Sequence, residues 1–171
     1  MTTDHFQFSR AYSIGHSTYP IEHFVGRLRA HGVEALADVR AYPGSRRHPQ
    51  FNREALERSL KDAGIAYHHM VSLGGLRKRN EAQEHEKFHG HSAFAAYIDY
   101  TKTEEFQAAL AKLETLARSR PTAFMCAEAD WRHCHRQFIA EAMSGHGFAV
   151  THIVSDAQER EQMRSPEIPG L

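Results

Sequence analysis

Thr122-Ala-Phe-Met-Cys126 is the stretch that decides the fold, because five residues without a charge or a turn former precede a charged turn and then a helical pattern. The pattern predicts a helix from Cys134 to Ser144, with Phe138, Ile139 and Met143 on its inner face. A short apolar run followed by an amphipathic helix is typical of one strand–helix unit in an α/β protein with parallel strands.

Further strand and helix patterns alternate on both sides of this unit. Pro20 suits the first turn of a helix, because its φ is fixed and it lacks an N–H, while Asn52 and Thr103 are suited to cap two later helices. The expected strands are residues 11–15, 33–39, 65–70, 122–126 and 148–154. This alternation predicts a single α/β domain over residues 1–171, with its core at about 11–155 and a partly flexible tail at 156–171.

The expected architecture is a Rossmann-like three-layer sandwich with a mostly parallel five-stranded sheet. Right-handed crossovers restrict its topology, and we expect the strand order 3-2-1-4-5. That order places a switch point between the first and fourth strands, where open α/β sheets bind ligands. Residues 71–92 interrupt the alternation with Gly74-Gly75 and a charged run, and we interpret them as a loop or lid.

The composition excludes several classes of protein. Lys plus Arg and Asp plus Glu both number 21 in 171 residues, so the chain lacks the positive excess of a general nucleic-acid coat. Two cysteines cannot form the disulfide framework of a secreted domain. No apolar run approaches the roughly 20 residues of a membrane span, and the first ten residues lack the apolar core of a signal peptide. We therefore expect a cytoplasmic protein without a membrane partner; the sequence does not indicate an oligomeric state.

Cys126 and Glu128 are the first candidates for chemistry, because they lie where the apolar strand ends and the next helix begins near Cys134. A thiol that faces a helix N-terminus has a lowered pKa, and His135 and Arg136 would add cationic partners. These features indicate a nucleophilic or redox-active cysteine. The alternative is a small buried residue at a strand end, since free cysteine is among the most buried residue types.

A second group of polar residues follows the first two strands. His16 and Ser17 come after the first strand, and Asp38 and Arg40 share one side of the second because side chains alternate along a strand. The loop after the second strand carries Ser45 and Arg46, and an arginine pair at 46–47 is able to grip a phosphate or carboxylate. Asp38 has the alternative role of orienting Arg40 or capping a backbone amide.

The first functional hypothesis is an enzyme that acts on a small anionic or nucleotide-like molecule. Cys126 would be the nucleophile or redox group, Glu128 the acid/base, and His16 or His135 the proton shuttle. The substrate-binding residues would be Ser17, Asp38, Arg40, Ser45, Arg46 and Arg136. The sequence does not indicate which cofactor the reaction would use.

Three other interpretations remain. A nucleotide- or nucleic-acid-binding module without catalysis would use the basic loops 46–48 and 77–79 and the aromatic rings of Tyr42, Phe51 and Trp131. A metal protein would draw on Cys126, Cys134, His135, Glu128 and His16. Its spacing fits a structural zinc site poorly, and Cys134 and His135 would diverge if both lay within a helix. We therefore expect no metal in the site. The C-x5-R spacing from Cys126 to Arg132 occurs in cysteine phosphatases, but Glu128 and Asp130 would repel a phosphate.

These polar stretches, taken together, resemble one family. They are Ser13-Ile-Gly-His-Ser-Thr18, Ala37-Asp-Val-Arg40, Pro43-Gly-Ser-Arg46 with Phe51, Leu73-Gly-Gly75, Met125-Cys-Ala-Glu128, Cys134-His-Arg136 and Val150-Thr-His-Ile153. Over residues 12 to 154 the chain resembles the Domain of Unknown Function 488 family of bacteria and archaea. The resemblance implies a compact α/β fold but no activity and no catalytic residue. Trp131-Arg132 departs from the looser turn expected there.

Overall fold

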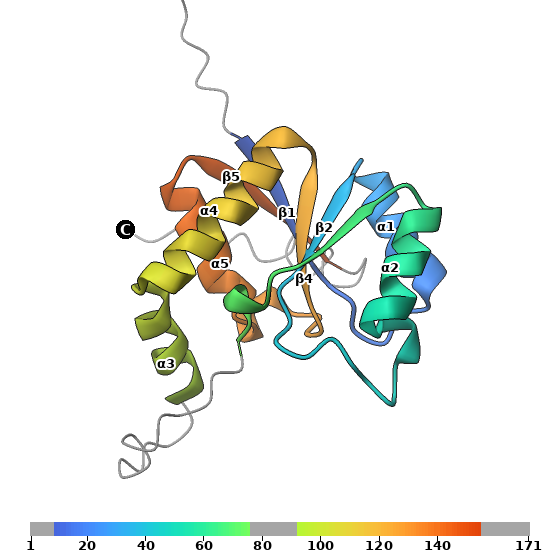
Figure 1. Cartoon of the computed structure of the whole chain (residues 1–171), viewed down its shortest axis with the longest axis horizontal. Helices are drawn as coiled ribbons and strands as arrows, with labels where there is room; N and C mark the ends of the chain where they lie inside the picture. The colour runs from blue at the N-terminus through green and yellow to red at the C-terminus, as the bar shows by residue number, and fades with distance from the viewer. Residues whose placement is uncertain (1–8, 76–91, 155–171) are drawn as a thin grey trace, which may run out of the picture.

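The computed structural model describes residues 9–75 and 92–154 (Figure 1). Its strands are β1 (Ser9–Gly15), β2 (Ala35–Asp38), β3 (Ala66–His69), β4 (Thr122–Cys126) and β5 (Phe148–Ile153). Its α-helices are α1 (Ile21–Ala30), α2 (Arg53–Asp62), α3 (Ser92–Thr101), α4 (Glu104–Ser119) and α5 (Arg136–Gly145). Short 3₁₀ turns form at Pro49–Phe51, Val71–Leu73 and Trp131–His133. Most of the predicted lid and the predicted flexible tail lie outside the described residues.

The five strands form one parallel sheet in the order β3-β2-β4-β1-β5. The predicted order 3-2-1-4-5 was therefore wrong, because β4 lies between β2 and β1. Burial explains the difference: Ala123, Phe124 and Met125 are fully buried, whereas β1 begins with partly exposed residues. The strand that is apolar on both faces takes the centre of a parallel sheet.

Helices cover both faces of the sheet, which confirms the predicted three-layer α/β class. Helices α1 and α2 lie on one face, and α3, α4 and α5 lie on the other (Figure 1). The connections that leave the adjacent strands β1 and β4 lead to α1 and α5, which belong to opposite layers. A switch point therefore lies between β1 and β4 in the observed order as well.

The helix starts differ from their predictions in two places. Thr103 caps α4 as predicted, because its Oγ1 accepts from the Phe106 N–H at 3.3 Å. Asn52 does not cap α2, because its side chain accepts instead from the Ser45 N–H at 2.5 Å. Helix α5 begins at Arg136 rather than Cys134, because Cys134 is extended, with φ −128° and ψ 151°. No helix within 9–75 or 92–154 has the length and apolar composition to span a bilayer.

Candidate functional site

The carboxyl ends of β1 and β4 are joined by backbone hydrogen bonds. The N–H groups of His16 and Ser17 donate to the carbonyls of Cys126 and Ala127, at 3.0 and 2.9 Å. A Cβ on Gly15 would lie 1.9 Å from the carbonyl oxygen of Glu128, so only glycine allows the two segments to pack this closely. The loop after β4 is therefore held against the end of β1.

A cavity of about 390 Å³ opens at this edge of the sheet. Aromatic side chains of Tyr42, Phe94 and Tyr97 form much of its wall, together with Arg40. The chemically reactive wall residues come from the end of β4 and the segment that connects it to α5: Cys126, Glu128, His133, Cys134 and His135. Ligand sites in open α/β sheets lie at such carboxyl edges.

Cys126, Cys134 and His135 bring their side chains together in this wall. His135 Nδ1 lies 3.9 Å from the sulfur of Cys126 and 3.6 Å from the sulfur of Cys134. All three atoms lie within 4.8 Å of one another. The expectation that Cys134 and His135 would diverge was wrong, because Cys134 is extended and lies before the first turn of α5, where helical geometry does not separate neighbouring side chains.

The two thiols have opposite tendencies to ionise. A hydrogen bond to Cys134, together with burial, raises the pKa of Cys126, in contrast to the lowered pKa that the sequence indicated. The same hydrogen bond lowers the pKa of Cys134, as do the His135 side chain and the charge of Arg136, although burial opposes them. If the pair loses one proton, the negative charge therefore belongs on Cys134 and the remaining proton on Cys126.

The orientation of the His135 ring is fixed from its far side. Nε2 lies 3.1 Å from the carbonyl oxygen of Val39, which only accepts hydrogen bonds, so Nε2 carries a proton. Nδ1 is then the ring atom that faces the two sulfurs. The ring packs against Tyr97 in an edge-to-face arrangement with a centroid distance of 5.2 Å, which restricts its rotation.

Asp38, Arg40 and His16 form a buried network behind the cavity. Arg40 donates from Nε and Nη2 to the two carboxylate oxygens of Asp38, at 2.9 and 2.7 Å. Arg40 Nη2 also donates to the Phe51 carbonyl, and Arg40 Nη1 lies 3.3 Å from His16 Nε2. The Tyr67 hydroxyl donates to Asp38 at 2.6 Å. Asp38 thus has the alternative role that the sequence suggested, because it compensates and orients Arg40.

Burial lowers the pKa of His16 to about 4; the charge of Arg40 acts in the same direction, and the hydrogen bond to the Ser17 carbonyl opposes them. His16 Nδ1 donates to that carbonyl at 2.9 Å, which leaves Nε2 to accept from Arg40. Burial also raises the pKa of Tyr67, as does its hydrogen bond to Asp38. His16 is therefore a neutral support for Arg40 at neutral pH.

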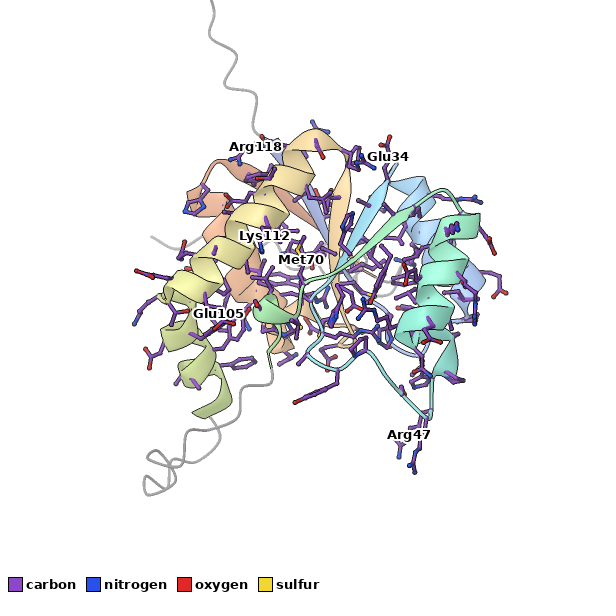
Figure 2. The ribbon with its side chains drawn as sticks, in the orientation of Figure 1. Glu34, Arg47, Met70, Glu105, Lys112 and Arg118 are labelled. Atoms are coloured by element: carbon purple, nitrogen blue, oxygen red, sulfur yellow. The ribbon has the colours of Figure 1, made fainter. Side chains whose placement is uncertain are left out.

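The structure gathers some of the sequence-predicted site residues and separates others. Arg40, Cys126, Glu128 and His135 line the cavity, whereas the other candidates do not: His16, Ser17, Asp38, Ser45, Arg46 and Arg136. The Ser45 hydroxyl accepts from the His48 N–H at 3.1 Å, within its own loop. Figure 2 shows Arg47 of the same loop projecting away from the sheet and helices.

The aromatic residues proposed to stack on bases are also differently placed. Phe51 is fully buried and stacks on His16. Trp131 stacks on His152 with ring centroids 3.9 Å apart, so one face of its ring is covered. Tyr42, which is 68% exposed, remains accessible. The sequence interpretation missed the walls formed by Tyr97 and Gly75, since neither residue type signals a site without knowledge of the topology.

Arg136 stabilises the loop after β4 by joining it to β1. Its side chain is 1% exposed, and it donates to the Ser13 hydroxyl at 2.9 Å and to the Glu128 carbonyl. Arg136 therefore contacts Glu128 through the backbone carbonyl. The Glu128 carboxylate instead accepts from the Asp130 N–H at 3.3 Å.

His152 should make the folded protein sensitive to mild acid. Burial lowers the pKa of His152 to about 4, and the charge of Arg136 acts in the same direction. The unfolded chain therefore binds more protons than the folded chain between pH 6.5 and 4, and stability falls as pH decreases through this window. After a discount for partial exposure, we expect His152→Phe to reduce this loss by about 1–2 kcal/mol.

Urea unfolding at pH 7 and pH 4.5 measures the effect, with His68→Phe as the control because His68 is exposed on the edge strand β3. Equal pH dependence in the wild type and His152→Phe would disprove the assignment.

Comparison with models of known protein families gives a match. The family model for the domain of unknown function DUF488 matches residues 20–143, most of the chain. The chain belongs to the DUF488 family, and the resemblance inferred from the sequence motifs is thereby confirmed. Neither the curated proteins nor the solved structures include a significant match.

Proposed function

We propose that this protein is an enzyme that binds a small anionic or nucleotide-like molecule in the cavity and acts on it with a thiol. One observation carries the proposal: two sulfurs and one imidazole nitrogen lie within 4.8 Å of one another in the wall of a cavity of about 390 Å³. Packing alone does not require two thiols and a histidine at a cavity wall. The position at the switch point between β1 and β4 supports the same conclusion.

The group has the parts that covalent thiol catalysis needs. Cys126 is the more exposed of the two cysteines, so its sulfur is the candidate nucleophile. As its sulfur forms a bond to an electrophilic atom of the substrate, the bond from that atom to its leaving group breaks and the leaving group takes the electron pair. The thiol proton passes to His135 Nδ1, 3.9 Å away. Glu128, also in the wall, is the candidate acid/base for the leaving or entering group.

The shape and composition of the wall support a substrate with a planar part. Tyr42, Phe94 and Tyr97 offer aromatic surface on which a base-like ring is able to stack. Arg40 and His133 are basic residues of the same wall, suited to an anionic part. Asp38 compensates the charge of Arg40, so we expect Arg40 to contribute hydrogen bonds more than net attraction.

A screen of nucleotides and phosphorylated metabolites by thermal shift tests the proposal. A ligand present at 100 times its dissociation constant stabilises a protein by about 2.7 kcal/mol. We expect a stabilising ligand to slow the reaction of Cys126 with iodoacetamide, measured by peptide mass spectrometry on metal-free protein, because both occupy the cavity. We also expect mass spectrometry to detect a product with the wild type and none with Cys126→Ser.

Arg58→Ala serves as the matched control, because Arg58 is exposed on α2, in the helix layer opposite α5, and should affect neither binding nor turnover. Stabilising ligands that leave the alkylation of Cys126 unchanged would place their site elsewhere and refute the proposal. Product formation that persists in Cys126→Ser would refute the role of the thiol.

A further inference from the structure

We infer that Cys126, Cys134 and His135 together form a binding site for a thiophilic divalent cation such as Zn²⁺. This inference concerns the same wall of the cavity but does not depend on the proposed reaction. Two thiolates and an imidazole are ligands that zinc prefers, whereas Mg²⁺ and Ca²⁺ prefer oxygen. Sulfur and nitrogen donors that converge from two segments, the end of β4 and the residues just before α5, therefore select a soft cation.

The separations of the His135 nitrogen from the two sulfurs are close to those of tetrahedral coordination. Zinc binds sulfur at about 2.3 Å and histidine nitrogen at about 2.0–2.1 Å, so a tetrahedral angle separates the two donors by about 3.6 Å. His135 Nδ1 lies 3.6 Å from the sulfur of Cys134 and 3.9 Å from the sulfur of Cys126. The two sulfurs lie within 4.8 Å of each other, and a tetrahedral zinc site separates two sulfurs by about 3.8 Å. A shift of at most about 1 Å would therefore bring all three donors to one cation.

The surroundings of His135 orient the ring for this role. Nε2 donates to the Val39 carbonyl at 3.1 Å, an interaction of the kind that fixes the tautomer of metal-binding histidines. Nδ1 is left as the donor atom. A Cβ on Gly75 would lie 2.6 Å from Nδ1, so the glycine keeps the approach to that nitrogen clear.

Three protein ligands leave the fourth coordination position of a tetrahedral cation open. Here all three ligands line the cavity. Sites with three ligands and an open position hold water or a small molecule there. A bound cation would also engage the lone pairs of both sulfurs and mask them from electrophiles. The metal-free and metal-bound forms should therefore differ in thiol reactivity.

Titration of the reduced, chelator-treated full-length protein with Co²⁺ tests the inference, because Co²⁺ reports thiolate coordination by absorption. We expect a sulfur-to-cobalt charge-transfer band in the near ultraviolet, intense visible bands of a four-coordinate site, and loss of both on addition of Zn²⁺. One equivalent of Zn²⁺ should also block iodoacetamide labelling of both cysteines, and a chelator should restore it.

Cys134→Ser and His135→Gln should each weaken Zn²⁺ binding, measured by competition with a chromophoric chelator. Loss of a direct ligand should cost at least as much as loss of an outer-shell partner, about 10–100-fold. His68→Asn is the matched control, because His68 is exposed on β3 and its loss should leave the affinity unchanged. Circular dichroism of each variant checks that it is folded, and His135→Gln tests the site if Cys134→Ser does not fold.

Absence of the charge-transfer band, or wild-type affinity in both folded variants, would overturn the metal site. Ligand protection of Cys126 in metal-free protein would then still support the proposed function. Conversely, the cobalt bands together with a failure of every small molecule to protect Cys126 would support the metal site and count against the proposed function alone.

Discussion

Asp38→Asn is expected to lower the free energy of unfolding by about 3–5 kcal/mol, because it leaves the buried charge of Arg40 uncompensated. The Asp38 side chain is fully buried and accepts from the backbone N–H, Nε and Nη2 of Arg40 and from the Tyr67 hydroxyl. Asparagine keeps the size of the side chain but directs an NH₂ group at one of these donors. Urea unfolding at pH 7 measures the loss.

Two further variants show whether the charge is the cause. Asp38→Leu combined with Arg40→Met removes both charges, and we expect this double variant to be more stable than Asp38→Asn, since apolar replacements of a buried ion pair are often neutral. Asp130→Asn breaks the more exposed pair with Arg132 and should cost no more than about 1 kcal/mol. An Asp38→Asn variant as stable as the Asp130→Asn variant would contradict the assigned role.

Arg136→Met is expected to be the second most destabilising change, at about 3 kcal/mol or more, because each hydrogen bond from a charged donor contributes about 1.5–3 kcal/mol. Methionine fills much of the same volume but leaves the Ser13 hydroxyl and the Glu128 carbonyl without this donor. We also expect the loop after β4 to loosen, because Arg136 joins it to β1. Faster amide hydrogen exchange at residues 127–129 would report that change.

Arg136→Lys distinguishes the contribution of the positive charge to stability from that of the two donor groups of the planar guanidinium. Lysine keeps the charge but cannot reach two acceptors from one planar group, so its stability should lie between those of the wild type and Arg136→Met. A loss below about 1 kcal/mol in Arg136→Met, within the range of ordinary surface substitutions, would show that the two hydrogen bonds do not hold the loop.

Two pairs of residues at the carboxyl edge of the sheet have different roles: the thiols are the proposed reactive groups, and the Asp38–Arg40 pair is structural. Cys126 and Cys134 line the cavity, whereas the Asp38 carboxylate accepts hydrogen bonds from Arg40 and Tyr67. Arg40 connects the two groups, since it is part of the wall and of the buried network. A change at Asp38 should therefore disturb ligand binding indirectly, through the position of Arg40.

The sequence by itself determined the α/β class, the family, the approximate bounds of every strand and the position of Cys126 and Glu128 at a strand end. These features depend on local properties: the apolar runs, the 3.6-residue periodicity and turn residues such as Pro20 act within a few residues of one another. The strand 122–126 was predicted with the bounds that the structure shows, because its apolar run ends where the charged turn begins.

Only the tertiary structure decided the strand order, the partners of Arg40 and the meeting of Cys134 and His135 with Cys126. The central place of β4 depends on which strand best tolerates burial on both faces, a comparison among strands far apart in the sequence. His135 turns toward the two sulfurs because the Val39 carbonyl, 96 residues away along the chain, holds its opposite nitrogen. Such contacts follow from the packing of distant segments, which no local pattern encodes.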